Sequence, residues 1–374
     1  MKNLEKDISI HNFQKTISSK RKVCFIVDNL GGGGSEKIAA QMSIFLSDKF
    51  SISIISIGDK VDYAYKGKLY NLGENASKIK LIKQFCKLLA FRNIYKKIDA
   101  DIYIDFRMRN RTLLEIFLHC FVFKINKTIF TIHSSNVFYH LPRPSWLHSH
   151  YAKARAIVCV SKAVKDDLFS IYPFQNLKYI PNFITPTTQP DLVMESIPEF
   201  DYVIAVGRLD NHVKQFDRLI VAYKNSKLYS QNMPLLILGT GPDEEPLRHQ
   251  IQSLELENHV KLLGFKPNVI NYMKSAKFLI LSSRFEGFPL VLTEALSVGT
   301  PVISFDCHSG PSEIVKNKSN GLLVKSQNFE ALTKAMNLMY EDKGLYNKCK
   351  SNSKTSVQKF SFSSILPKWL DLLQ

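Results

Sequence analysis

The chain has 374 residues, of which 45% are hydrophobic and 22% charged, and this composition is typical of a globular protein rather than a disordered or fibrous one. The length favours two domains. No run of 18 or more apolar residues occurs and residues 1–22 are polar, so the sequence predicts no spanning helix and no signal peptide. We therefore expect a cytoplasmic protein, in which the apolar stretch from Leu113 to Phe123 forms a buried helix.

The net charge of +17 is unevenly distributed along the chain. Residues 1–184 carry a net charge of +15, whereas residues 185–374 carry +2. A strongly basic half indicates a polyanionic partner, either a nucleic acid or an anionic membrane surface.

The six cysteines are scattered and contain no C-x-x-C pair. Several of them, including Cys24, Cys120 and Cys159, lie in apolar stretches, where cysteine behaves as a small hydrophobic residue. Neither a disulfide framework nor a zinc site is expected.

Short apolar runs alternate with longer helical patterns along the whole chain. Apolar strands separated by helices predict parallel sheets that are covered on both faces. In the first half the expected strands are Lys22–Val27, Ser51–Ile57, Asp101–Asp105, Lys127–Ile132 and Ala156–Val160. In the second half they are Tyr202–Val206, Leu235–Leu238, Val260–Leu263, Phe278–Leu281, Pro301–Phe305 and Leu322–Val324.

A proline-rich interval, Pro181–Glu199, separates these two sets of strands and suits a linker. We expect two doubly wound α/β domains, one covering residues 1–184 and the other residues 185–359. Ligands of such sheets bind beyond the carboxyl ends of the strands, so the cleft between the domains is the expected site.

A glycine cluster, Gly31 to Gly34, follows the first strand and precedes a helical stretch that runs through Leu46. Backbone N–H groups in such a turn, together with the helix dipole, favour an anion. The cluster matches neither G-x-G-x-x-G nor a Walker A loop. A plain tight turn with Ser35 as its N-cap accounts for the pattern equally well.

Two cations follow the first strand of the second half. Arg208 comes directly after the strand and Lys214 lies in the next turn. Together they would neutralise a diphosphate, because arginine grips phosphate bidentately and lysine acts as a mobile point charge. Two solvated surface cations would give the same local pattern.

Two carboxylates then stand eight residues apart, and glycine clusters mark the neighbouring turns. Glu286 lies in a loop before a helix, and Glu294 is expected about two turns into that helix. Carboxylates at this offset can accept hydrogen bonds from two polyols of one ligand, such as a sugar and a ribose. Each of them also fits a helix-dipole or capping role.

These blocks together resemble the family-4 retaining glycosyltransferases, group 1 enzymes of the GT-B fold. The likeness spans roughly residues 22–340 and is most specific from Ser282 to Ile303. It consists of Gly-Arg-Leu…Lys, Gly-x-Gly-Pro and Phe-Glu-Gly-Phe-Pro-x5-Ala…Gly-x-Pro-Val-Ile. The resemblance implies two Rossmann-like domains facing a cleft, with a nucleotide sugar on the second. It also implies that the final helix, within residues 360–374, packs back on the first domain through Trp369.

The resemblance assigns donor-binding roles in the second half. Arg208 and Lys214 would contact the diphosphate, Glu294 the ribose and Glu286 the sugar hydroxyls, and Phe265–Lys266 would lie against the base. Backbone N–H groups of Leu290 and Val291 would contact the phosphates. Gly241, Gly287 and Phe288 complete the expected donor site on this side.

In the first half the resemblance places Gly32, Gly33 and Gly34 over the phosphates. It also places His133, at the end of the strand Lys127–Ile132, beside the transferred sugar. A lone histidine at a strand end is otherwise usually structural. With the family likeness we expect His133, Arg208, Lys214 and Glu286 to be the catalytic residues.

One position departs from the family pattern. Lys214 stands seven residues after Gly207 where six are usual, and Gln215 follows it where the family has glycine. The loop is one residue longer, so the resemblance supports the role of Arg208 more firmly than that of Lys214.

The resemblance implies transfer with retention by front-face substitution. The sequence shows no glycosidase-type carboxylate pair and no Asp-x-Asp metal motif, so we expect no metal ion and no cofactor. Arg208, Lys214 and backbone N–H groups would stabilise the leaving diphosphate. The stretch Asp306–Glu313 resembles a variant common in enzymes that use UDP-hexoses or UDP-N-acetylhexosamines, which favours UDP over GDP.

The basic first half bears on the acceptor. Ser77–Lys97 is a basic amphipathic helix, which predicts either peripheral contact with anionic lipid or an ordinary helix packed on the sheet. Related enzymes often act on lipid-linked acceptors, so synthesis of lipooligosaccharide, capsule or a similar glycan at the inner membrane face is the natural hypothesis. Arg107, Arg109 and Arg111 would either contact this acceptor or form a solvated basic edge.

Two other functions fit parts of the sequence. A GT-B relative could epimerise or hydrolyse a UDP-sugar without an acceptor. A nucleic-acid-binding protein would account for the charge, but the chain shows no recognisable nucleic-acid module, so no nucleic-acid partner is expected.

Overall fold

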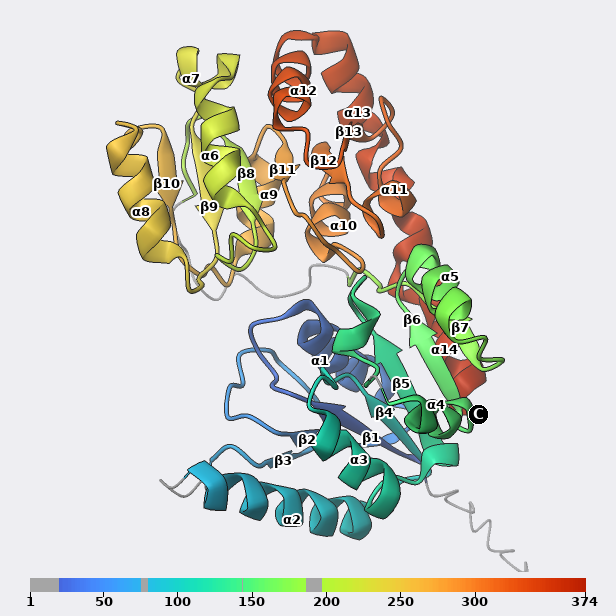
Figure 1. Cartoon of the computed structure of the whole chain (residues 1–374). Coiled ribbons are helices and arrows are strands. Elements are labelled where there is room, and N and C mark those ends of the chain that lie inside the picture. Colours follow the sequence, from blue (N-terminus) through green and yellow to red (C-terminus); the bar gives the residue numbers. More distant parts are fainter. Residues whose placement is uncertain (1–19, 75–79, 143, 186–196) are drawn as a thin grey trace, which may run out of the picture.

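The computed structural model describes residues 20–74, 80–142, 144–185 and 197–374. Two lobes are visible in Figure 1, one built from the first half of the chain and the other from the second half. Each lobe contains one parallel sheet with helices on both faces. The prediction of two doubly wound α/β domains is therefore confirmed.

The first lobe contains a seven-stranded sheet in the order β3-β2-β1-β4-β5-β6-β7. Its strands are β1 Lys22–Val27, β2 Ser51–Ser56, β3 Lys68–Asn71, β4 Ile102–Asp105, β5 Thr128–Ile132, β6 Ala156–Cys159 and β7 Leu177–Tyr179. Its α-helices are α1 Gly34–Leu46, α2 Lys80–Ile98, α3 Thr112–Phe121, α4 Ser145–Ala152 and α5 Lys162–Ile171, with 3-10 turns η1 Ile125–Lys127 and η2 Val137–Tyr139.

The second lobe contains a six-stranded sheet in the order β10-β9-β8-β11-β12-β13. Its strands are β8 Val203–Val206, β9 Leu235–Leu238, β10 Val260–Leu262, β11 Leu279–Leu281, β12 Val302–Asp306 and β13 Gly321–Lys325. Its helices are α6 Phe216–Lys224, α7 Lys227–Ser230, α8 Glu244–Ser253, α9 Val269–Ser275, α10 Leu290–Ser297, α11 Pro311–Ile314, α12 Phe329–Glu341 and α13 Lys343–Ser356, followed by the 3-10 turn η3 Gln358–Phe360.

The expected strands agree with the structure to within one residue at each end. Two strands were not predicted, β3 and β7, and both lie at the edges of the first sheet. Each is short and partly polar, so neither produces the apolar run that marks a central strand. The predicted domain boundary near residue 184 falls between β7 and β8, and its position stays a prediction because residues 186–196 are outside the described ranges.

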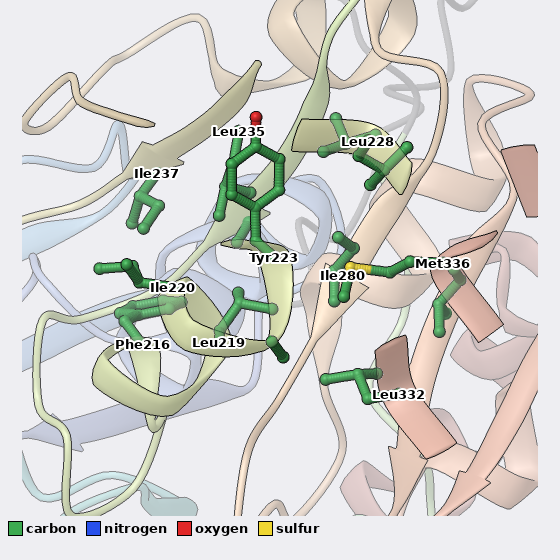
Figure 2. Close-up of a cluster of buried hydrophobic side chains, with 14 of the residues drawn as sticks. Phe216, Leu219, Ile220, Tyr223, Leu228, Leu235, Ile237, Ile280, Leu332 and Met336 are labelled. Carbon is green, nitrogen blue, oxygen red and sulfur yellow. The ribbon is translucent and has the colours of Figure 1, made fainter. Parts of the chain in front are cut away.

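The core of the second lobe shows how the helices are fixed on their sheet. Figure 2 shows side chains of α6 and α12 directed toward strands β9 and β11. Phe216, Leu219 and Ile220 of α6 are at most 2% exposed, and Met336 of α12 is fully buried. Their spacing of three or four residues is the spacing of one helix face, so the periodicity that predicts the helix also builds the core.

The last helix, α14 Phe362–Leu373, leaves the second lobe and packs on the first, as the family resemblance predicts. Its buried residues Ile365, Trp369 and Leu373 join the core formed by β1, β4 and α1. Arg155 donates a hydrogen bond to the carbonyl of Leu372 at 2.6 Å. Because Trp369 is 4% exposed, it packs in the core and is not positioned to bind a ligand.

Helix α3 is present, but it is only partly buried. Leu113 is 84% exposed and Phe121 is 64% exposed, whereas Glu115 is 1% exposed. Cys120, expected in an apolar environment, is also exposed. The helix therefore buries Glu115 and His119 together with Leu118, while Leu113 and Phe121 face solvent.

Helix α2 covers most of the predicted basic amphipathic segment, although Ser77–Ile79 lie outside the described residues. Phe91, Tyr95 and Ile98 are buried against the first sheet. In its described part, α2 uses its apolar side for the core. No helix in the described ranges is both long and apolar enough to span a bilayer.

Replacing Trp369 with alanine tests the contact between α14 and the first lobe. We expect Trp369→Ala to lower the free energy of unfolding by about 3–5 kcal/mol, because it opens a large cavity in a core shared by residues from both ends of the chain. Urea denaturation measures the change, with the exposed Asp371→Ala on the same helix as control. Equal stability of the two variants would show that α14 is not part of this core.

Candidate active site

The two sheets have the same internal strand order, so each has a switch point between its first and fourth strands. In the second lobe this point lies between β8 and β11. Arg208 and Lys214 follow β8, and Glu286 follows β11. Parallel sheets bind ligands at such points, because the loops on either side diverge and leave the strand ends accessible.

Lys214 and Glu286 form an ion pair across this switch point. The Nζ of Lys214 lies 2.5 Å from Oε1 of Glu286, and the two side chains are 18% and 11% exposed. The backbone of Lys214 is held to the β11 loop, since its carbonyl accepts a 2.7 Å hydrogen bond from Ser282. Arg208 is exposed and forms no ion pair with the described residues. The predicted cations are thus placed together, one paired and one available.

The departure at Gln215 has a structural explanation. Gln215 adopts φ 55° and ψ 40°, the left-handed conformation that glycine enters most easily. Its amide side chain hydrogen-bonds with that of Gln327, which is also left-handed. This side-chain pairing stabilises a non-glycine residue at a position where the family has glycine. It also stabilises the longer loop, which ends at Lys214.

Glu294 also forms an ion pair, with a partner that the sequence did not indicate. The Nζ of Lys37, on α1 of the first lobe, lies 2.5 Å from Oε1 of Glu294 on α10. Because α10 begins at Leu290, Glu294 stands one turn into the helix and not two as expected. The pair joins the two lobes, and Glu294 is the carboxylate that the family likeness assigns to the ribose.

Gly287 brings the two lobes into backbone contact. A Cβ atom at Gly287 would lie 2.0 Å from the carbonyl oxygen of His133. Only glycine permits this approach, so the loop after β11 rests directly on the end of β5. His133 and Glu286, predicted from opposite halves of the chain, are therefore brought close together.

His133 is half-buried, and neither of its ring nitrogens has a hydrogen-bond partner among the described residues. The ring stacks on Phe106 with 5.7 Å between centroids. Burial, with the charge of Arg109 nearby, lowers the pKa of His133 to about 3. The imidazole is therefore neutral at physiological pH, with one donor and one acceptor nitrogen, both buried and unpartnered in the described part of the chain.

The N-termini of helices α1 and α10 meet at the same boundary. Gly34 begins α1, and a Cβ there would lie 3.3 Å from the side chain of Leu290, which begins α10. The first N–H groups of a helix have no partner within it and carry partial positive charge. The expected contributions of Gly32–Gly34, Leu290 and Val291 thus converge on one place.

The remaining predicted donor residues divide into exposed and structural positions. Phe265 is 55% exposed in the loop after β10, beside Lys266. The side chain of Phe288 is 5% exposed and packs on Phe360, so it belongs to the core. A Cβ at Gly241 would lie 2.2 Å from the carbonyl oxygen of Leu209, which makes glycine necessary there for packing of the turns.

The sequence predicted that Arg107 and Arg109 either contact the acceptor or form a solvated basic edge. Both predictions are wrong, because these side chains are 3% and 0% exposed. Arg107 pairs with Asp105 at 2.8 Å and with Glu115 at 3.2 Å. Burial alone would raise the pKa of Asp105, but the two arginines hold it below its ordinary value. Arg111 is exposed, as a basic edge requires.

Arg109 holds the loops that carry His133. Its guanidinium donates hydrogen bonds to four backbone carbonyls, those of Asp105, Arg107, Thr131 and His140, at 2.7–3.2 Å. These carbonyls come from the ends of β4 and β5 and from the turn η2. Arg109 therefore fixes the carboxyl ends of β4 and β5 from the interior of the first lobe.

The stretch Asp306–Glu313 also links the lobes. The carboxylate of Glu313 accepts hydrogen bonds from the backbone N–H of Lys162 at 2.7 Å and from the hydroxyl of Tyr179 at 2.6 Å. His308 lies 2.5 Å from Asp167 of α5. This stretch was singled out only for donor identity, and its contacts to α5 and β7 were not expected.

A metal centre and a cavity between helices have less support as functional sites. In the described part of the chain no group of three or more His, Cys, Asp or Glu could hold a metal ion. A cavity of about 690 Å³ lies between α6 and α12, lined in part by Arg218 and Phe329. It lies along helices rather than at strand ends, and Arg218 is stacked 4.1 Å from the Phe329 ring centroid.

Comparisons with known proteins agree with this geometry. The family model for glycosyl transferases group 1 matches residues 195–356. A Campylobacter jejuni protein, N-acetylgalactosamine-N,N'-diacetylbacillosaminyl-diphospho-undecaprenol 4-alpha-N-acetylgalactosaminyltransferase, is 31% identical over 91% of this chain and 96% of its own length. The amylovoran biosynthesis glycosyltransferase AmsD of Erwinia amylovora is 25% identical over 94% and 99%.

Solved structures share the fold at low sequence identity. HepE of Anabaena in complex with UDP-glucose has a TM-score of 0.74 and 18% identity, covering 94% of this chain and 99% of that one. S. aureus TarM has a TM-score of 0.73 and 15% identity, covering 94% and 99%. The GT-B fold is confirmed.

The chain belongs to the group 1 glycosyltransferases. It is a glycosyltransferase of the GT-B fold, similar over nearly its whole length to enzymes of bacterial polysaccharide and lipid-linked glycan synthesis.

The low pKa of His133 predicts a pH dependence of stability. The unfolded chain protonates His133 below about pH 6.5, whereas the folded chain does not until about pH 3, so stability is lost as the pH falls between these values. Between pH 7 and pH 5 the wild type should lose about 2 kcal/mol more than His133→Phe, as measured by urea unfolding. Parallel losses in the two proteins would show that His133 is protonated in the folded state.

Proposed function

We propose that the protein transfers a hexose or N-acetylhexosamine, with retention, from a UDP-sugar to a lipid-linked or saccharide acceptor in bacterial surface-glycan synthesis. The observation that carries this proposal is the Lys214–Glu286 ion pair, which stands beside Arg208 and is brought by Gly287 against the end of β5 at His133. Together these residues provide two cations for a diphosphate, the Glu286 carboxylate for sugar hydroxyls, and the neutral imidazole of His133, which has no hydrogen-bond partner among the described residues.

In this proposal Arg208 and Lys214 stabilise the charge that develops on the leaving diphosphate, together with the first N–H groups of α10. Arg208 is exposed and Lys214 is partly accessible, so both side chains can reach a ligand. Stabilisation of developing charge by preorganised groups is generally the largest contribution to catalysis. The substrate is held for same-face attack, which is a positioning task.

Glu286 and His133 would contact the transferred sugar from opposite lobes. Glu286 is 11% exposed and accepts hydrogen bonds only, while neutral His133 has one donor and one acceptor nitrogen. Glu294 would accept hydrogen bonds from the ribose hydroxyls when Lys37 gives up its place beside the carboxylate. The two hydroxyls of a ribose would then supply two donors to the carboxylate in place of the ammonium group of Lys37.

The choice of UDP is supported by the motif Asp306–Glu313 and by the fold neighbours crystallised with UDP or UDP-glucose. The lipid-linked acceptor is supported by the Campylobacter jejuni relative, whose name specifies a diphospho-undecaprenol substrate. We also propose that transfer needs no metal ion and no cofactor, with the cations of the chain at the diphosphate, and that the enzyme works at the inner face of the cytoplasmic membrane.

Transfer assays with one lysine removed test the function directly. We expect Lys214→Met to lower kcat/KM for sugar transfer from a UDP-sugar by about 10²–10³, because a donor aimed at developing charge is lost. Lys227→Met is the matched control, since Lys227 also pairs with a glutamate, Glu341, but on the outer surface. Release of UDP is measured with UDP-glucose, UDP-galactose and their N-acetyl forms, each with and without EDTA and a polyprenyl-diphosphate-linked saccharide.

Each outcome of this assay decides a separate part of the proposal. Acceptor-dependent, EDTA-insensitive release of UDP that falls only in Lys214→Met supports it. Free sugar or an epimer formed from donor alone would instead indicate a hydrolase or epimerase. Full activity in Lys214→Met would remove this residue from the catalytic group, and loss of activity with EDTA would contradict metal independence.

A further inference from the structure

The orientation of α3 is fixed from inside the protein. Glu115 and His119 are four residues apart and lie on the buried face, at 1% and 4% exposure. Glu115 accepts hydrogen bonds from Arg107 at 3.2 and 3.3 Å, and Arg107 is itself buried. Rotating the helix to bury its apolar face would leave a buried guanidinium without one of its partners, which is strongly unfavourable.

Leu113 and Phe121 of α3 therefore face outward, whereas Leu118 is buried and Leu114 and Phe117 are partly buried against the core. Leu113, Phe117 and Phe121 follow each other at four-residue intervals, and the rings of Phe117 and Phe121 lie 5.3 Å apart. Leu113 and Phe121 are the most exposed large apolar side chains in the described part of the chain. Contiguous exposed apolar surface on a soluble protein marks an interaction site.

Helix α4 packs beside α3 and adds another exposed aromatic residue. Trp146 of α4 is 46% exposed, and its ring lies 6.0 Å from that of His150, which in turn lies 6.1 Å from His119 on the buried face of α3. Tryptophan is enriched where one side of a residue is apolar and the other wet, as at a membrane interface. We call Leu113, Phe117, Phe121 and Trp146 the α3 surface.

The surface also leads toward the candidate active site. Met108, in the loop between β4 and α3, is 49% exposed, and Tyr139 after β5 is 41% exposed. The two segments are joined by a 2.8 Å hydrogen bond from the N–H of Arg109 to the carbonyl of Tyr139. Apolar exposure thus runs from α3 to the strand end that carries His133.

The charge near the α3 surface is predominantly positive. Residues 106–165 contain ten lysines and arginines, of which Arg107 and Arg109 are buried, and a single acidic residue, Glu115, which is also buried. Arg111 is exposed at the start of α3 and Lys153 at the end of α4, whereas Lys124 pairs with the exposed Asp99. Basic residues near an anionic lipid surface are attracted to it. Exposed apolar side chains beside cations match an anionic bilayer, in which side chains enter the acyl boundary and cations meet the headgroups.

We propose that the α3 surface, and not α2, docks the enzyme on an anionic lipid bilayer. The inference rests on the proposed function in one respect, since a lipid-linked acceptor would then reach the strand ends from the docked side. The described side chains of α2 argue against that helix as the inserting element, because Phe91, Tyr95 and Ile98 are in the core. Of the basic residues of α2, Lys96 and Lys97 are exposed.

Vesicle flotation tests this inference with the full chain. The probes are vesicles of phosphatidylcholine alone and of phosphatidylcholine with phosphatidylglycerol. We expect binding to the anionic vesicles only, weakened by salt, and an affinity at least tenfold lower for the double variant Leu113→Ser/Phe121→Ser. Val221→Ser/Leu338→Ser, two exposed apolar residues of the second lobe, is the matched control, and Leu89→Ser tests α2.

Three results would overturn the inference. The α3 variant could bind as the wild type does, the loss could follow Leu89→Ser instead, or light scattering could show a dimer that the α3 variant breaks, which would assign the surface to a second copy. The response of each variant to UDP in thermal unfolding is measured alongside. A UDP response missing from all proteins would count against the proposed function, whereas one retained by a variant that no longer floats supports the docking surface alone.

Discussion

The backbone contact between Gly287 and His133 is the constraint on which the candidate site depends. It places the loop after β11 against the end of β5, at a separation that any side chain at Gly287 would prevent. The other links between the lobes are consistent with this approach, namely Lys37 with Glu294 and Glu313 with Tyr179. The end of β5 and the loop after β11, some 150 positions apart in sequence, thereby face one boundary.

Around this contact, charge is arranged in two ways. Buried charges, Asp105, Arg107 and Glu115, are fully paired and fix the strand ends and the orientation of α3. At the boundary itself the lysine–glutamate pairs remain partly exposed, so a ligand can exchange for one partner. The ion pairs of Arg107 with Asp105 and Glu115 fix the strand end beneath the site. They also orient α3 so that Leu113 and Phe121 face solvent, where the proposed membrane surface lies.

The sequence predicted every central strand because a buried parallel strand is a continuous apolar run. Edge strands such as β3 lack that run and were missed. Helix α3 was expected to be buried, but it is only partly so, since its local pattern does not reveal that Arg107 requires a buried carboxylate. The residues of the second-lobe site could be named from contiguous motifs, whereas Lys37 could not, because its partner Glu294 lies 257 positions away and only the folded chain brings them together.

In the proposed function a uridine nucleotide binds at this boundary, with its ribose on Glu294. Thermal unfolding with UDP, GDP and ADP, each with EDTA, tests it most directly on the wild type, Glu294→Gln and the surface control Glu341→Gln. At 100 times its dissociation constant UDP should add about 2.7 kcal/mol of stability to the wild type and the control, and clearly less to Glu294→Gln. Stabilisation by no nucleotide, or equal stabilisation of all three proteins by UDP, would contradict the account.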